Sequence, residues 1–144
     1  MTPTIRRATA EDAPACAVIV ADWIDATDWM PGGRLTRARL EEIMREGFPT
    51  REAWVAERDG TVLGYLSMKA EEAHIIGLYV ARPGQGVGRA LIDHVKDGRT
   101  YLKLRSHAPN TAAHRFYRRE GFVTVARDLP GDDGVPEILM EWRA

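Results

Sequence analysis

The sequence has a single cysteine, Cys16, no long apolar run and almost no excess of charge of either sign. One cysteine cannot form an internal disulfide and fits a reducing compartment. Because a bilayer span needs about 20 apolar residues, we expect no membrane segment and no leader peptide. The formal net charge is -1 and the basic residues are spread out, so no basic stripe for nucleic acid exists. We therefore expect a cytoplasmic protein with neither membrane nor nucleic-acid partners.

The composition that is present is that of a globular protein, with 44% hydrophobic and 28% charged residues. A chain of 144 residues can bury a real core, and we expect residues 1–144 to form one domain. Apolar patterns and turn signals predict an α/β (α+β) fold with a mixed, mostly antiparallel sheet of 6-7 strands and about four helices. The expected strands cover residues 4–8, 53–57, 62–68, 74–80, 101–105, 122–127 and 137–142, and the expected helices follow Thr9, Thr36, Gly86 and Asn110 or Thr111.

The most informative stretch is a strand that passes through a glycine-rich turn into a helix, between Tyr79 and Lys96. Gly84, Gly86 and Gly88 alternate through the turn, and glycine lets the backbone come close to a ligand. The N–H groups of such a turn converge at a helix N-terminus, where the helix dipole adds positive charge. The turn therefore predicts a diphosphate site. The order of elements argues against a doubly wound dinucleotide-binding fold.

A second segment supports that prediction, and it runs Asn110-Thr-Ala-Ala-His-Arg-Phe-Tyr-Arg-Arg-Glu-Gly-Phe122. Together with the glycine turn it resembles the GNAT superfamily of acyl-CoA-dependent N-acyltransferases. The family's Asn-x-x-Ala-x-x-Phe-Tyr-x-x-x-Gly-Phe pattern falls here without a gap, and the last positions of its Q/R-x-x-G-x-G/A loop fall on Gly86 and Gly88. The first loop position is Pro83, which lacks a donor, and the loop is about two residues shorter than the family pattern. Arg82 or Gln85 are the alternative donors.

The resemblance implies a sheet that splays between its fourth and fifth strands and transfer of an acetyl group from acetyl-CoA to a primary amine in a ternary complex. Tyr117 would protonate the departing thiolate, since a phenol can donate to a thiolate. Asn110 would bond the pantetheine chain, cap its helix, or do both. The implied cofactor contacts are Leu78, Tyr79 and Val80 at the thioester, Gln85, Gly86, Val87, Gly88, Arg89 and Ala90 at the diphosphate, and Asn110, Phe116 and Tyr117 on the second segment.

The acceptor ammonium must lose a proton before it can attack, and no family motif fixes the base. Glu57, Glu71, Glu72 and His74 lie in or beside the central strands. We favour His74 or Glu72, although a lone strand histidine is often structural and a turn glutamate is often solvated.

The acceptor pocket of the family is usually built by the first two helices and their connection, which here holds Trp23, Asp25, Asp28 and Trp29. These acids and rings could hold a cationic amine; alternatively the rings fill the core and the acids are surface charges. We favour the core role for Trp23 and leave Trp29 open. His94, His107 and His114 lack the spacing of a metal set, so we expect packing or surface roles for them. Cys16 lies on an apolar stripe and is expected to be buried and inert.

Three alternatives stay open at this point. The scaffold could use another acyl-CoA, it could hydrolyse the thioester, or it could be a non-catalytic CoA-binding module, which the altered Pro83 position would suit. The sequence does not identify the acceptor amine. Exposed edge strands make a homodimer plausible.

Overall fold

The computed structural model describes residues 2–31 and 35–144 and confirms the expected architecture. The order of elements along the chain matches the order expected from the sequence, with two short 3-10 turns added. The strands are β1 (Thr4–Arg7), β2 (Glu52–Arg58), β3 (Thr61–Lys69), β4 (His74–Val80), β5 (Tyr101–His107), β6 (Val123–Leu129) and β7 (Glu137–Arg143). The helices are α1 (Ala13–Asp25), α2 (Arg37–Gly47), α3 (Val87–Lys96) and α4 (Thr111–Arg119), and the 3-10 turns are η1 (Ala10–Asp12) and η2 (Ala70–Glu72).

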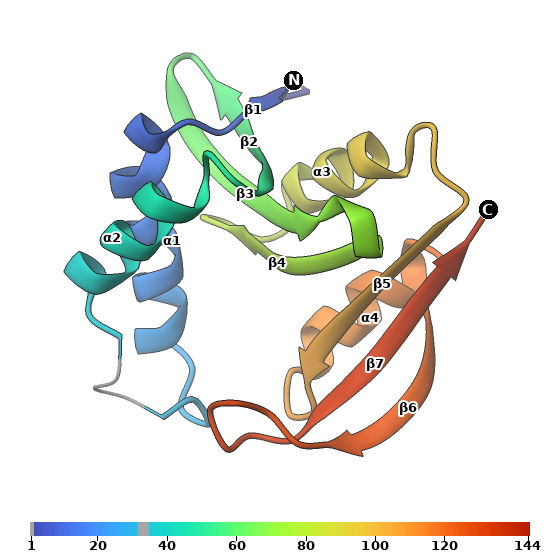
Figure 1. The fold of residues 1–144 in the computed structure, drawn as a ribbon. Coiled ribbons are helices and arrows are strands. Elements are labelled where there is room, and N and C mark those ends of the chain that lie inside the picture. The colour runs from blue at the N-terminus through green and yellow to red at the C-terminus, as the bar shows by residue number, and fades with distance from the viewer. Residues whose placement is uncertain (1, 32–34) are drawn as a thin grey trace.

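The seven strands form one sheet in the order β1-β2-β3-β4-β5-β7-β6. Every neighbouring pair is antiparallel except β4 and β5, which are parallel and pair only at His74 with Lys103 and at Ile75 with Leu104. Beyond Ile75 the two strands diverge, as Figure 1 shows. The predicted splay between the fourth and fifth strands is therefore confirmed.

A β-bulge in β4 accounts for the position of this splay. Ser67 pairs with Gly77 and Met68 pairs with Ile75, so Ile76 is an extra residue without a partner in β3. A bulge bends its strand and increases the local twist. Because β4 leaves β5 immediately after Ile75, we attribute the opening of the sheet to this extra residue.

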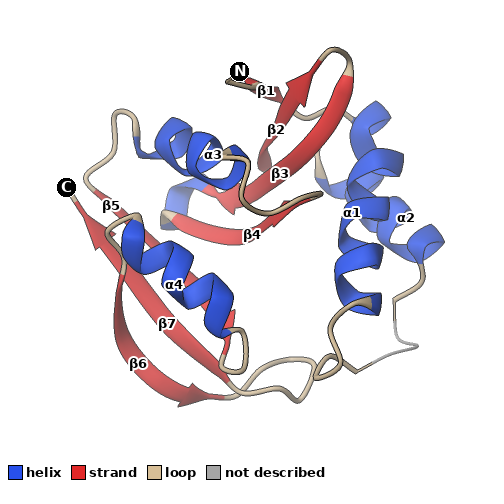
Figure 2. Ribbon diagram, turned by 180° about the vertical axis from the view of Figure 1, so that it is seen from behind, coloured by secondary structure: helices blue, strands red, loops and turns tan. Residues whose placement is uncertain are grey.

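The helices cover the sheet unequally, and this leaves two separate cores. One core lies under α3 and α4, which share one face of the sheet in Figure 2. The other lies between α1, α2 and the first strands. Cys16 is fully buried in this second core, as expected, and burial raises the pKa of its thiol to about 12. Among the described residues no helix is long and apolar enough to cross a membrane.

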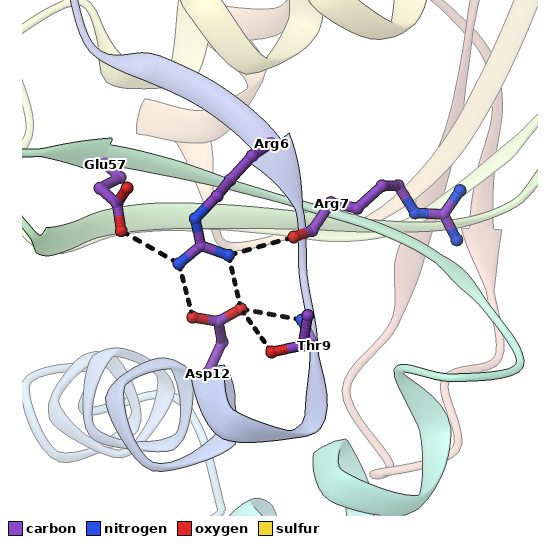
Figure 3. A network of polar contacts seen from close by, with 5 residues as sticks. All are labelled: Arg6, Arg7, Thr9, Asp12 and Glu57. Carbon is purple, nitrogen blue, oxygen red and sulfur yellow. Dashed lines mark hydrogen bonds and ion pairs between the residues drawn. The ribbon is translucent and has the colours of Figure 1, made fainter.

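A buried carboxylate ties the first strand to the start of α1 (Figure 3). Asp12 is 7% exposed and accepts two hydrogen bonds from Arg6, at 2.8 and 2.9 Å. Arg6 also reaches Glu57 in β2 at 3.0 Å. The Thr9 N–H donates to Asp12 Oδ2 at 2.8 Å, as in a capping box, and the 3-10 turn η1 precedes α1. The Arg6 guanidinium holds the pKa of Asp12 below its usual range.

We expect Asp12→Asn to lower the free energy of unfolding by about 2 kcal/mol at neutral pH, because charge-assisted hydrogen bonds to Arg6 are lost. A depressed folded-state pKa contributes stability above the unfolded pKa of about 4, and this contribution is lost as the pH falls through the folded value. The variant should therefore be less stable than the parent at neutral pH, and the difference should shrink in acid. Urea unfolding at both pH values measures this, with the exposed Asp22→Asn as the control.

Candidate active site

The backbone of β4 beyond the bulge has a free edge on the side of β5. The Ala81 N–H donates to Leu63 O at 2.8 Å, which fixes the phase of the β3–β4 ladder. Because N–H groups alternate in direction along a strand, those of Leu78 and Val80 point away from β3. They face the region where β5 has moved away. Two of the three residues predicted as thioester contacts thus have N–H groups at the opening, whereas by the same alternation the Tyr79 N–H points to β3.

The glycine turn ends in a helix with unpaired donors. Gly84 and Gly86 have φ of 81° and 77°, and Gly86 is the N-cap of α3. The first four N–H groups of a helix have no partner within it, here those of Gly86 to Arg89. Ala90 differs from the prediction, because its N–H donates to Gly86 O at 3.0 Å and is not among the free donors. The site fits an anion, since these donors and the helix dipole converge on one exposed turn.

Gly88 brings the turn against the second sequence motif. A Cβ on Gly88 would lie 3.1 Å from the ring of Phe116, so α3 begins in close contact with α4. Asn110 caps α4 by accepting a hydrogen bond from Ala113 N at 3.3 Å, which leaves its side-chain NH₂ for a ligand. The structure thus places the two motifs side by side.

Tyr117 lies on the face of α4 that packs against the sheet. It is 8% exposed and contacts Phe116 and Phe122, with ring centroids 5.2 and 5.6 Å away. Burial, with a smaller contribution from Tyr79 in β4, raises the pKa of the Tyr117 phenol well above its ordinary value. Tyr117 is therefore held in its protonated form, which is the form that a proton donor needs.

The residues favoured from the sequence as the base lie at the closed end of the β4–β5 pair. His74 is the first residue of β4 and is still paired with Lys103. Burial, followed by the charge of Lys103, lowers its pKa. Glu72 is exposed in η2, 4.0 Å from Lys69. At about 3.3 Å per residue, His74 is about 13 Å along the strand from Leu78. Glu57 pairs with Arg6 at the other end of the sheet.

An aromatic cluster lies on the opposite side of the opening from α4. Trp23 contacts Trp29, Tyr79 and His107, with ring centroids 5.7, 5.4 and 6.2 Å away. Trp29 contacts His107 at 5.2 Å. The core role that the sequence favoured for Trp23 does not match its position in the structure. Its side chain is half-buried and contacts β4 and the end of β5. The acids of the same connection, Asp25 and Asp28, are exposed.

His107 is the residue that sequence reasoning missed. Its Nε2 lies 2.7 Å from Asp133 Oδ2, and Glu137 brings a carboxylate within 4.8 Å of both. Arg105 engages Glu137 at 2.7 Å. Asp133 is 26 residues from His107, so no local spacing could indicate the pair. The one available signal was that His107 lies two residues beyond the strand expected over residues 101–105, which borders the predicted splay.

Two cavities lie away from this region. One, of about 190 Å³, is lined by residues of η2, β2 and the connection after α2. The other, of about 760 Å³, lies between α3 and the two chain ends. Neither contains the glycine turn, Tyr117 or His107, so the candidate site rests on the backbone and side chains described above.

Comparisons with known proteins converge on one family. The family model described as "Acetyltransferase (GNAT) domain" matches residues 49–124. The peptidyl-lysine N-acetyltransferase YiaC of Escherichia coli (strain K12) is 28% identical over 96% of this chain and 95% of its own. The solution structure of apo YjaB from Escherichia coli superposes with a TM-score of 0.78 at 28% identity, covering 98% of this chain and 96% of that one. The structure of yncA from Salmonella typhimurium with its cofactor acetyl-CoA shares the fold, with a TM-score of 0.72 at 21% identity over 99% and 94% of the two chains.

Proposed function

The chain belongs to the GNAT family of acetyltransferases, and from that premise we propose that its opened sheet binds acetyl-CoA and presents the thioester to an amine. The protein is an acetyl-CoA-dependent N-acetyltransferase. The observation that carries the proposal is the free edge of β4, which leads directly into the glycine turn and α3. We propose further that residues 1–144 form a single catalytic domain.

In the proposed complex, the N–H groups of Leu78 and Val80 bond the thioester and the pantetheine chain as a missing strand would. The donors from Gln85 to Arg89 hold the diphosphate at the N-terminus of α3, where the dipole favours an anion. Asn110, the N-cap of α4, and Phe116 within that helix contact the pantetheine chain. A donor aimed at the carbonyl oxygen stabilises the negative charge that develops there during attack.

Tyr117 is proposed as the general acid. Direct transfer in a ternary complex expels a thiolate, which needs a proton as the C–S bond breaks. The phenol is buried beside β4 and stays protonated through the neutral range. Desolvation also raises the pKa of the thiol whose thiolate is expelled into the same region. Proton transfer from the phenol to the thiolate therefore remains favourable.

We propose that the acceptor is the side chain of a peptidyl lysine. YiaC is named a peptidyl-lysine N-acetyltransferase and aligns over nearly the whole chain. The side of the opening away from α4 carries the rings of Trp23 and Trp29 and the carboxylates of Asp133 and Glu137. Aromatic faces and carboxylates are the groups that attract an alkylammonium.

We expect Trp29→Ala to raise the KM for a lysine peptide about 10-fold, because the ring offers a cation–π face worth about 1–2 kcal/mol. The affinity for CoA should not change, since Trp29 lies on the acceptor side. Steady-state kinetics and calorimetry measure the two quantities. Trp29→Phe keeps a ring and serves as the matched control. An unchanged KM in the alanine variant would show that Trp29 does not contact the acceptor.

The test of the proposed function is a panel of amines assayed with acetyl-CoA by release of free thiol. A lysine peptide with a blocked N-terminus is expected to react faster than a peptide whose only amine is its N-terminus. Calorimetry with CoA is run alongside. Uptake of CoA without turnover of any amine would indicate a binding module, and thiol release without amine would indicate a hydrolase.

We also propose a cytoplasmic location and a homodimer. Cys16 is a buried free thiol, which a reducing compartment preserves. The edge strand β6 exposes Val123 and Val125, at 60% and 48%, on the rim of the sheet. A second copy packing there would cover both side chains.

A further inference from the structure

His107 and Asp133 form an oriented pair at the end of β5. The carboxylate of Asp133 can only accept at neutral pH, so the His107 Nε2–H donates to Asp133 Oδ2 across 2.7 Å. Burial works to raise the pKa of Asp133, but hydrogen bonds from the Val135 N–H and from His107 outweigh it and lower the pKa below its usual range. With Nε2 as the donor, Nδ1 carries the lone pair of the neutral ring.

The backbone around His107 is fixed by neighbours from α4. Its carbonyl accepts from Asn110 N at 3.0 Å and from the Nε2–H of His114 at 3.1 Å. His114 is 4% exposed, and burial lowers its pKa, which keeps its ring neutral. The ring of His107 is therefore held at a defined position between the turn before α4 and the aromatic cluster.

The register of the parallel strands places His107 across the opening from the proposed thioester site. His74 pairs with Lys103 and Ile75 with Leu104. Because Ile76 is an extra residue in β4, three residues beyond Leu104 in β5 correspond to four residues beyond Ile75 in β4. This sets His107 level with Tyr79, about 10 Å beyond the last paired residues. Trp23 spans the gap, since its ring contacts both His107 and Tyr79. Leu102, Leu104 and Ser106 are buried, whereas His107 is on the alternate face of β5, with the tryptophans.

Two carboxylates lie beside the His107 ring. Asp133 contacts it directly and Glu137 brings a second carboxylate into the same cluster. The guanidinium of Arg105 is directed to Glu137, at 2.7 Å, and neutral His114 faces the His107 carbonyl. The rings of Trp23 and Trp29 complete the surroundings among the described residues.

We propose that His107, oriented by Asp133, is the catalytic base that takes the proton from the acceptor ammonium. This inference rests on the proposed function. The Nδ1 of His107 accepts one proton, and the amine lone pair forms the N–C bond to the thioester carbonyl carbon. The C–S bond then breaks with its electron pair on sulfur, and Tyr117 protonates the thiolate. The second nitrogen proton restores the Tyr117 phenol, so each turnover releases one proton from His107 to solvent.

This assignment replaces His74 and Glu72, which were favoured from the sequence. Both lie at the closed end of β4, before the bulge and before the strands separate. His107 comes from the other strand of the splay and is level with the proposed thioester contacts. The base and the acid then approach the thioester from opposite faces of the sheet, with the acceptor on the face that carries the tryptophans.

The experiment compares the parent protein with His107→Gln on two peptides. The first peptide has a lysine, and in the second the lysine ammonium is replaced by an aminooxy group, which is neutral near neutral pH. We expect kcat/KM for the lysine peptide to fall about 100-fold, at the lower end of the effect of a general base. The aminooxy peptide should be affected little, because it has no proton to lose before attack. Without the base only the neutral amine reacts, so the rate of the variant with the lysine peptide should keep rising with pH towards the amine pKa of about 10.

Two further variants separate the base from a structural role. Asp133→Asn should lower kcat/KM for the lysine peptide more than for the aminooxy peptide, without changing the affinity for CoA, because the ring loses the carboxylate that orients its Nε2–H. His94→Gln, on α3 beside Trp54, is the matched control and should leave the pH profile as in the parent. Circular dichroism and CoA calorimetry establish that each variant is folded.

The outcomes are distinguishable from failure of the proposed function. If the parent binds CoA but transfers acetyl to neither peptide, the proposed function itself is wrong. If the parent is active and His107→Gln equals it on the lysine peptide, only the base assignment is overturned. An equal loss on both peptides would also overturn it, since a merely structural contact would affect both alike. A loss confined to the lysine peptide in His74→Gln, and absent in His107→Gln, would return the role to the base favoured from the sequence.

Discussion

Replacing Tyr117 by phenylalanine is expected to lower kcat about 1000-fold while the affinity for CoA stays unchanged, since a general acid contributes about 10²–10⁴ in rate. Phenylalanine fills the same space in the core beside Phe116 and Phe122 and removes only the hydroxyl. Without it, the thiolate must take its proton from water in a region that water enters poorly. Single-turnover measurements of thiol release isolate this step from product release.

The pH dependence gives a second test of the same residue. Burial and the neighbouring Tyr79 raise the pKa of Tyr117. The protonated phenol is the active form, so a raised pKa moves the alkaline limb of the profile to a higher pH than an exposed tyrosine would give. Tyr101→Phe is the matched control. Tyr101 lies at the far end of β5, and its hydroxyl donates to Glu141 in β7. Full activity in Tyr117→Phe would show that the ring only packs.

Replacing Gly86 by valine is expected to weaken CoA binding about 150-fold. Its φ of 77° is costly for a β-branched residue, so the turn should change conformation and misdirect the donors before α3. Loss of two charge-assisted hydrogen bonds of about 1.5 kcal/mol each gives about 3 kcal/mol, which corresponds to this factor. Isothermal calorimetry with CoA measures it directly.

Gly60 supplies a closely matched control for this substitution. Its φ is 78°, and like Gly86 it has open space where a Cβ would stand. It lies in the β2–β3 hairpin, far along the chain from the proposed diphosphate site. Gly60→Val should therefore lose similar thermal stability and keep its affinity for CoA. If both variants bind CoA equally well, the turn before α3 does not hold the diphosphate.

Local patterns predicted most of the fold because local rules govern its elements. The apolar patterns of residues 53–57 and 62–68 predicted two successive strands, which pair in the structure as the antiparallel strands β2 and β3. The helix expected after Asn110 or Thr111 is confirmed, because Asn110 is the N-cap of α4 and Thr111 is its first residue. The prediction that the Ala90 N–H is free to bind the diphosphate was wrong, because the N–H of the fourth residue after an N-cap already bonds within the helix.

The candidate base could not be predicted, because it depends on contacts between distant segments. His107 and Asp133 come from a strand end and a loop that meet only when β5, β7 and β6 are assembled. Trp23 continues the apolar stripe of α1 in sequence, yet its ring reaches Tyr79 and His107 near the opening. The periodicity of apolar residues in a helix indicates which face is apolar, but it does not indicate which residues that face contacts in the folded protein.

The sequence by itself determined the order of elements, the glycine turn and the Asn110–Phe122 segment, because these depend on residues close together in the chain. The family resemblance implied an opening between the fourth and fifth strands, and only the tertiary structure decided at which residue the sheet opens and which side chains line the two sides of the opening. The extra residue at Ile76 bends β4 away from β5, and that separation sets Tyr117 on one face and His107 with the tryptophans on the other.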